Sequence, residues 1–237
     1  MTTPNTVPAH VTIIMDGNGR WAAQRGKERL YGHQEGVESV RACTEFAVEK
    51  GIRYLSLFAF SEENWARPAE EIEGLMQMML HAIFQEIPTF QKHNIRFRVI
   101  GDFTRLSEKL KKEIADCMLL TSGNTTLDLI VFLSYSGKWD LVQAVNGFMK
   151  ENRGTDGSIP EITQDALAGY LSTTGIPDPD LLIRTSGEQR ISNYMLWQTA
   201  YTEYYFTETL WPDFRKTHFQ QALDAFAQRD RRYGKIK

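Results

Sequence analysis

The segment VTIIMDGNGRW, residues 11–21, joins a short apolar run directly to an acid, two glycines and an arginine. A β-rich apolar run of this length is typical of a buried strand, and the glycines behind it predict a tight turn. In an open α/β sheet, ligands gather where loops leave the carboxyl ends of the strands. The segment therefore predicts a ligand site directly after a first strand, with Asp16 as its first polar residue.

Further runs of this kind alternate with stretches of helical period along the chain. They are YLSLFAF (54–60), IRFRVIG (95–101), LDLIVFLSY (127–135) and LLIRT (181–185). The alternation predicts the α/β class, with a mostly parallel central sheet of about six strands flanked by helices. We expect a first long helix from about Gln34 to Lys50, capped by Gly51, and a loop over 151–161 between two later helices.

The length of 237 residues and the ordinary composition favour a single domain. We expect that domain to span residues 1–237, with residues 1–9 as a flexible N-terminus and residues 228–237 as a C-terminal tail. A net charge of −3 gives no general attraction to nucleic acid. The chain shows no secretory signal, no apolar run of about 18 residues and no cysteines at metal spacing. These features predict a cytoplasmic protein whose membrane contact is at most peripheral.

The glycines after the first strand fit more than one kind of site. Gly17, Gly19 and Ala22 match the GxGxx(G/A) spacing of a dinucleotide-binding turn. That site needs an acid at the end of a second strand about 20 residues later, whereas the next strand here ends near Phe60. A carboxylate repels a phosphate unless a divalent cation lies between them. Asp16 therefore indicates Mg²⁺ and a phosphorylated ligand, and the alternative is that it is only a turn residue.

Two groups of cationic side chains follow strands of the predicted sheet. The first is Arg20, Arg25, Arg29 and His33, and the second is Arg184 and Arg190 with Ser192 beside them. Guanidinium groups bind phosphate oxygens through two parallel donors, so each group suits a diphosphate. The alternative for the second group is a surface ion pair with Glu188. Two cationic groups beside one acid indicate two phosphorylated substrates.

The segment IEGLMQMMLHAIFQEIPTF, residues 72–90, carries a broad apolar stripe at helical spacing. Core packing is the ordinary explanation of such a stripe. Its three methionines also suit the wall of an apolar tunnel for a flexible ligand. The charged segment SEENWARPAEE before it, residues 61–71, has the composition of a lid.

Several of these segments together resemble the cis-prenyltransferase family over nearly the whole chain. They are HVTIIMDGNGRWA (10–22), GHQEGVESVR (32–41), LFAFSEENWARP (57–68), the WD at 139–140, DLLIRTSGEQRISN (180–193), MLWQTAYTEYYFTETLWPDF (195–214) and RDRRYG (229–234). The resemblance implies repeated condensation of isopentenyl diphosphate onto an allylic diphosphate, usually farnesyl diphosphate, with cis geometry. The expected product is a long-chain polyprenyl diphosphate such as undecaprenyl diphosphate, the precursor of the cell-wall lipid carrier. Mg²⁺ is the implied cofactor and a homodimer the implied assembly.

The resemblance also implies residue roles. Asp16 would hold Mg²⁺ and act in catalysis together with Asn64. The residues implied for the allylic diphosphate are Gly17, Asn18, Gly19, Arg20, Trp21, Arg29, His33, Phe60, Ser61, Trp65 and Arg67. Those implied for isopentenyl diphosphate are Arg184, Arg190 and Ser192, with Glu203 as a second metal ligand and Arg231 or Arg232 completing a neighbouring subunit's site. Gln189 stands where some relatives have histidine, and this departure bears on the metal role of Glu203.

Two functions of other classes are alternatives. A non-catalytic relative would bind prenyl chains or support a catalytic partner, but it would be expected to lack the acid or the arginines that this chain has. A metal-dependent phosphohydrolase would also place an acid at a strand end, and it would release inorganic phosphate without needing isopentenyl diphosphate.

Overall fold

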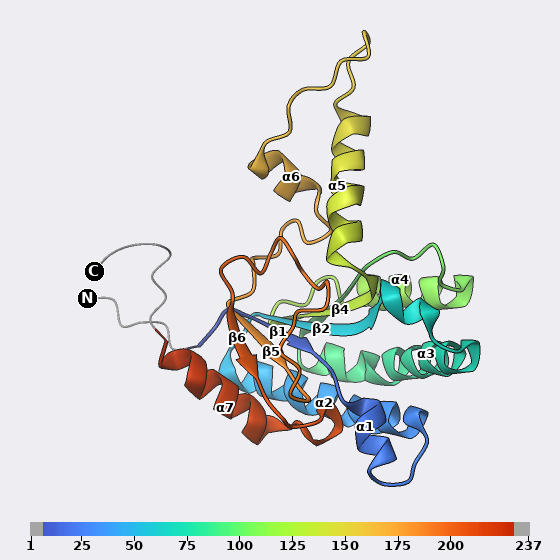
Figure 1. Ribbon diagram of the computed structural model, residues 1–237, viewed down its shortest axis with the longest axis vertical. Coiled ribbons are helices and arrows are strands. Elements are labelled where there is room, and N and C mark those ends of the chain that lie inside the picture. The colour runs from blue at the N-terminus through green and yellow to red at the C-terminus, as the bar shows by residue number, and fades with distance from the viewer. Residues whose placement is uncertain (1–6, 230–237) are drawn as a thin grey trace.

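The structure is a computed structural model that describes residues 7–229 (Figure 1). Most of the expected N-terminal and C-terminal tails, including Arg231 and Arg232, lies outside the described residues. The described chain folds around one six-stranded sheet with the order β3-β4-β2-β1-β5-β6. All neighbouring strands are parallel, which confirms the predicted α/β class and sheet.

Five of the strands coincide with the predicted apolar runs. They are β1 (His10–Ile14), β2 (Tyr54–Ser61), β3 (Ile95–Ile100), β4 (Leu127–Tyr135) and β5 (Leu181–Arg184). The sixth, β6 (Glu203–Phe206), is a short edge strand paired in parallel with β5. Because β2 lies on one side of β1 and β5 on the other, the strand order reverses at β1, and the crevice beyond its carboxyl end is the usual ligand position.

Helices cover both faces of the sheet (Figure 1). The α-helices are α1 (Asn18–Ala23), α2 (Arg29–Lys50), α3 (Ala69–Lys92), α4 (Glu108–Leu120), α5 (Gly137–Glu151), α6 (Gln164–Tyr170) and α7 (Lys216–Ala227), and the 3₁₀ helices are η1 (Glu62–Ala66) and η2 (Trp211–Asp213). Helices α2, α3 and α7 pack on one face, whereas α5 stands out from the other with α6 beside it. The segment between α5 and α6 is a loop, as predicted.

The start of α2 differs from the prediction by five residues, because the helix begins at Arg29 rather than near Gln34. Gly32 lies in the first turns of α2, and glycine disfavours a helix, so the sequence did not indicate that the helix extends through it. A Cβ at Gly32 would lie 2.0 Å from the carbonyl oxygen of Asn18, so only glycine lets α1 pack this closely against α2. The end of α2 is as predicted, since Gly51 caps it with a φ of 72°.

The helix predicted over residues 72–90 lies within α3, and its apolar residues pack mainly toward the core. The predicted lid segment is more ordered than a loop, because η1 and the first turn of α3 take up most of it. Among residues 7–229, no helix combines the length and the apolar composition needed to cross a bilayer.

Candidate active site at the carboxyl end of the sheet

Asp16 is held in place through its backbone. Its N–H donates to the hydroxyl of Thr185 at 2.9 Å, and the same hydroxyl donates to the Asp16 carbonyl at 2.6 Å. The Trp211 N–H donates to that carbonyl as well, at 3.0 Å. Asp16 is therefore fixed between the end of β5 and η2, and its carboxylate projects onto the rim with 30% of the side chain exposed.

Two arginines flank the Asp16 carboxylate. Arg184 Nη2 lies 2.9 Å from Oδ2 and Arg20 Nη2 lies 3.4 Å from Oδ1. Burial alone would raise the pKa of Asp16, but the hydrogen bond and charge of Arg184 outweigh it, and the charge of Arg20 acts in the same direction. The pKa of Asp16 therefore lies below its ordinary value, and the carboxylate is ionised at neutral pH.

The glycines beside Asp16 let neighbouring side chains approach the backbone closely. Gly17 has a φ of 110°, and a Cβ there would come within 2.9 Å of Leu210 Cδ2. A Cβ at Gly19 would lie 2.9 Å from Nη1 of Arg29. The guanidinium of Arg29 therefore reaches over the turn that follows Asp16. Arg25 of the same predicted group lies elsewhere, since it stacks on Trp21 and pairs with Asp213 at 3.4 Å.

Arg29 and Arg67 converge on Glu71, an acid that the sequence analysis missed. Arg29 Nε and Arg67 Nη1 each lie 3.3 Å from Glu71 Oε1. The only sequence signal for this acid is its spacing of four from Arg67 in the first turn of α3. Glu71 links the two arginines and so joins α2 and α3 at the rim.

His33 lies behind these arginines, in the second turn of α2 rather than at the helix start expected from the sequence. Burial is the main cause that lowers its pKa to about 4. The positive charge of Arg67 adds to this effect, and Glu71 opposes it. The ring is therefore neutral near pH 7, and its buried Nε2 has no hydrogen-bond partner.

The second cationic group is centred on Arg184, which is 4% exposed. Its Nη1 donates to Ser192 Oγ at 2.6 Å and to the Arg190 carbonyl, while its Nε is buried without a partner. Arg190 itself is well exposed and pairs with Glu188, so the alternative ion pair is present in the structure. Glu188 also lies 3.5 Å from Arg20 Nη1, which makes the two cationic groups neighbours.

Ser186 is a second residue that the sequence analysis gave no role. Its hydroxyl accepts from Arg20 Nη2 at 2.5 Å, and its carbonyl accepts from Arg20 Nη1 at 3.1 Å. Ser186 lies in the left-handed region, with a φ of 79°. Its position two residues after the end of β5 was the available signal, because the ends of β1, β2 and β5 carry polar groups to the rim.

The residues expected near the reacting atoms lie on β2 and η1. The N–H of Ser61 donates to Asn64 Oδ1 at 3.1 Å, which fixes both in a capping arrangement. Trp65 donates to Ser134 Oγ at 2.9 Å and meets Phe60 edge to face at 5.1 Å between ring centroids. Trp21, in contrast, points to Asp213, to which its Nε1 donates at 2.7 Å, and it does not line the cavity.

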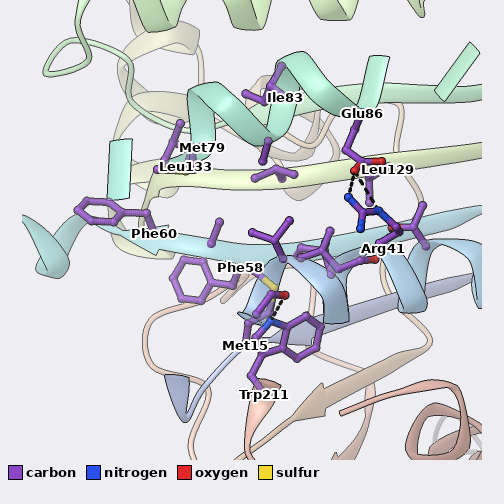
Figure 2. A pocket seen from close by; sticks show the side chains of 18 of the residues that line it. Met15, Arg41, Phe58, Phe60, Met79, Ile83, Glu86, Leu129, Leu133 and Trp211 are labelled. Carbon is purple, nitrogen blue, oxygen red and sulfur yellow. Dashed lines mark hydrogen bonds and ion pairs between the residues drawn. The ribbon is translucent and has the colours of Figure 1, made fainter. Parts of the chain in front are cut away.

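A cavity of about 610 Å³ starts at this rim and runs between the sheet and helices α2 and α3. The predicted site residues that line it are Asp16, Asn18, His33, Phe60, Ser61, Asn64, Arg67, Arg184 and Ser192. Figure 2 shows Met15, Phe58, Met79 and Leu133 among the apolar side chains deeper inside. The cavity therefore joins charged groups at the rim to a mainly apolar interior, and a few charged side chains of α2 and α3 also border it further along.

Glu203 is not at this rim. It opens β6 and pairs in register with Leu181, which pairs with Val11, so it lies level with the amino end of β1. Five residues of strand separate that level from Asp16, roughly 16 Å. Glu203 is instead bound to Arg229 at 2.7 Å. Within one chain, therefore, Glu203 and Asp16 cannot share a metal ion.

Comparison with known proteins places the chain in a family. The family profile described as "Putative undecaprenyl diphosphate synthase" matches residues 14–234. A ditrans,polycis-undecaprenyl-diphosphate synthase ((2E,6E)-farnesyl-diphosphate specific) of Haemophilus ducreyi is 47% identical over 231 residues, which cover 98% of this chain and 96% of that protein. An isoprenyl transferase of Porphyromonas gingivalis is 46% identical, over 97% of this chain and 90% of that protein.

Solved structures agree with the sequence relatives. Lavandulyl diphosphate synthase from Lavandula x intermedia, in complex with dimethylallyl diphosphate, superposes with a TM-score of 0.91 at 34% identity, over 97% of this chain and 99% of that one. A "probable undecaprenyl diphosphate synthase" from Campylobacter jejuni gives a TM-score of 0.80 at 30% identity, over 96% and 99% of the two chains. Since profile, relatives and structures agree over nearly its full length, this chain belongs to the cis-prenyltransferase family.

Proposed function

We propose that the protein condenses isopentenyl diphosphate with an allylic diphosphate, farnesyl diphosphate first, and repeats the step to build a long cis-polyprenyl diphosphate such as undecaprenyl diphosphate. The observation that carries this proposal is a cavity with a largely apolar interior and two cationic groups at its mouth. Arg67 and Arg184 line the mouth, and Arg29 and Arg20 pair with acids beside them. The relative from Haemophilus ducreyi is named for the same product and the same primer. A site for one phosphorylated metabolite would need neither the second arginine group nor the apolar depth.

The reaction breaks the allylic C1–O bond while the double bond of isopentenyl diphosphate forms a new carbon–carbon bond at C1. A proton then leaves the isopentenyl unit, and the new double bond forms with cis geometry. Negative charge grows on the departing diphosphate as the C1–O bond breaks. Arg20, Arg29 and Arg67, which lie together at the rim, are assigned to stabilise this charge where it develops. Such stabilisation is a large source of catalytic power in group-transfer enzymes.

Arg184 and Ser192 are assigned to the other diphosphate, that of isopentenyl diphosphate. Arg184 is buried and rigidly bonded, and its unpartnered Nε gives one donor for a phosphate oxygen. Asn64 stands next to the reacting centre with its amide carbonyl bound to Ser61, so its NH₂ group is the part assigned to substrate. The rim thus binds donor and acceptor at separate arginines with Asp16 between them.

The donor set at Asp16 suits Mg²⁺ held jointly with a substrate. Among the described residues, no three His, Cys, Asp or Glu side chains cluster in a way that would hold a metal ion without other ligands. Mg²⁺ commonly binds through one or two carboxylates and completes its coordination with substrate phosphates and water. Asp16 offers the carboxylate, and Asn18, which lines the same cavity, has a buried Oδ1 without a partner. When bound, Mg²⁺ would neutralise charge on the departing diphosphate.

The apolar interior is assigned to the growing prenyl chain. Each CH₂ group removed from water gains about 0.8 kcal/mol, so a chain of several prenyl units is strongly favoured inside such a cavity. Met79 and Ile83 of α3 line it on one side and Leu129 and Leu133 of β4 on another (Figure 2). The apolar stripe on α3 therefore both packs in the core and lines the cavity, as the two interpretations of the sequence had it.

We further propose a cytoplasmic homodimer that touches membranes only peripherally. Its support is the shape of the monomer, in which α5 stands out from the sheet with Val142 and Met149 exposed (Figure 1). If Glu203 binds metal at all, it must do so from a second copy, since its own chain keeps it away from Asp16. The same assembly would give Arg231 or Arg232 a neighbouring site to complete.

The test incubates the purified protein with farnesyl diphosphate, labelled isopentenyl diphosphate and Mg²⁺, and sizes the extracted lipid. We expect polyprenyl products that require both diphosphates and that vanish when EDTA removes the metal. The coupled product is inorganic diphosphate, one per added unit. Orthophosphate released without isopentenyl diphosphate would instead show a phosphohydrolase, and binding of prenyl chains without turnover would show a non-catalytic relative.

A further inference from the structure

The seam between α2 and α3, where facing residues of the two helices border the cavity, is apolar near the rim and carries charged residues further along. Near the rim the facing residues that line it are apolar, namely Val37 on α2 and Met78 and Ala82 on α3. One turn further along, the facing residues are Arg41 and Glu86, and beyond them the lining includes Glu45, Glu49, Thr89 and His93. The ion pair thus marks the point where charged side chains join the lining, although Val48 and Phe90 beyond it are apolar.

Arg41 and Glu86 bridge the two helices at this point (Figure 2). Arg41 Nη2 and Nε lie 2.5 and 3.1 Å from Glu86 Oε1. The side chains are 36% and 15% exposed, so the pair borders both the cavity and solvent. It therefore closes the seam with a polar contact rather than with apolar packing.

Two features make this contact easy to open. Arg41 also binds Glu38 through Nη1, at 2.6 and 2.7 Å, so it keeps one carboxylate if Glu86 moves away. Pro88 lies inside α3, two residues after Glu86. Because proline has no N–H, the carbonyl of Phe84 loses its helical donor and α3 is weakened in the turn that carries Glu86.

The cavity volume is too small for a long prenyl chain, and this bears on the role of the Arg41–Glu86 contact. An apolar cavity of about 150 Å³ holds one benzene, so 610 Å³ holds roughly 24 carbons, or about five prenyl units. The relative from Haemophilus ducreyi is named for an undecaprenyl product, which has eleven. A chain of that length does not fit in the cavity as it stands. The seam at Arg41 and Glu86 borders both the cavity and solvent, so it offers the chain a way out.

We propose that the Arg41–Glu86 ion pair is a gate in the side of the cavity, which the far end of a prenyl chain must displace once the chain exceeds about five units, and that this gate sets product length. The inference rests on the proposed function. Early condensations proceed with the gate closed. Later condensations must open the gate and are therefore slower. The chain length at which this cost stops elongation is the product length.

The experiment compares Glu86→Gln and Arg41→Gln with the unchanged protein and with Asp128→Asn as a control. Asp128 pairs with Arg98 at 3.3 Å. The side chains of Arg98 and Asp128 are 28% and 14% exposed, much like those of the Arg41–Glu86 pair, and neither lines the cavity. Products are sized over time from farnesyl diphosphate and labelled isopentenyl diphosphate, with detergent micelles present to accept emerging chains. Thermal unfolding of each variant checks that it is folded.

We expect the unchanged protein to accumulate intermediates of about five to six units, and both gate variants to remove that accumulation. The share of products longer than the main product should rise about fivefold, the factor that corresponds to a pair worth ~1 kcal/mol. The double variant should add nothing to either single one, since both break the same contact. An unchanged length distribution in folded gate variants, or an equal shift in Asp128→Asn, would overturn the gate alone. Failure of the unchanged protein to elongate at all would overturn the proposed function as well.

Discussion

The two ends of β1 carry polar groups that are bonded in opposite ways. At its start, the buried ring of His10 meets the Pro177 carbonyl at 2.6 Å and Ser56 Oγ at 2.7 Å, so both ring nitrogens have partners. Past its end, three buried atoms have none: Asn18 Oδ1, His33 Nε2 and Arg184 Nε. One further unpartnered atom among the described side chains, Gln198 Oε1, belongs to the separate hydrogen-bond network around Asp140.

Whether a buried polar atom has a hydrogen-bond partner distinguishes structural residues from ligand-binding residues better than charge or burial does. Burial lowers the pKa of both His10 and His33 to about 4, so their titration alone does not distinguish them. A buried polar atom without a partner costs about 1–3 kcal/mol, and such atoms are rare in folded proteins. All three belong to residues that line one cavity, and they are best explained by a ligand that supplies the missing partners.

The largest effect that tests this comparison is expected at Asp16. Asp16→Asn keeps an acceptor for Arg184 but removes the negative charge that would hold a cation beside the diphosphate. We expect the turnover number to fall at least about a hundredfold. Steady-state kinetics with both diphosphates measures it, and near-normal turnover would show that the carboxylate has no part in the reaction.

Asp180 gives a matched control at the other end of the strand. Its Oδ2 accepts from the backbone N–H groups of Ala9 and His10, at 2.8 and 3.1 Å. Asp180→Asn is expected to lower stability by about 1 kcal/mol and to leave turnover at 25 °C unchanged. If this variant lost activity as Asp16→Asn does, the two ends of β1 would not differ in the way their hydrogen bonds indicate.

Much of the rim could be predicted because it follows the strands. The runs that became β1, β2 and β5 are apolar and short, and a parallel sheet brings the residues after them to one edge. Asp16, Ser61 and Arg184 were placed together by that rule alone. In contrast, β6 reads EYYF, its residues are only half-buried, and nothing in its pattern distinguishes it from a loop.

Contacts that join distant segments could not be predicted from one sequence. Glu71 links Arg67, four residues away, with Arg29, 42 residues away, and only the first of these has a regular spacing. The resemblance supplied Glu203 as a metal ligand but not its position. Whether β6 brings that residue to the active rim depends on register and strand direction, and both place it at the opposite end.

An intermediate effect is expected in the dependence of stability on pH. The pKa of His10 is about 4 in the folded protein, and an exposed histidine titrates near 6.5. Between these values the unfolded chain binds more protons, so the stabilisation is complete above pH 6.5 and is lost as the pH falls toward 4. For fully buried His10 the loss is about 3 kcal/mol at most. Urea unfolding at a series of pH values measures it, and stability that rose on acidification through this range would contradict the prediction.

The smallest effect is expected at His33, and it separates the two histidines directly. The charges of Arg67 and Arg29 help to keep the pKa of His33 low, and a bound diphosphate would offset them, whereas no ligand is expected near His10. Farnesyl diphosphate without isopentenyl diphosphate should therefore raise the pKa of His33 by about one unit, or about 1.4 kcal/mol, and leave that of His10 where it is. Imidazole resonances followed by NMR through a pH titration report both rings in one sample. If the pKa values of His10 and His33 rose together, the cause would be a general loosening of the fold rather than a ligand near His33. If neither moved, the unpartnered Nε2 would not face the diphosphate, and the rim would have to bind its ligand through the arginines alone.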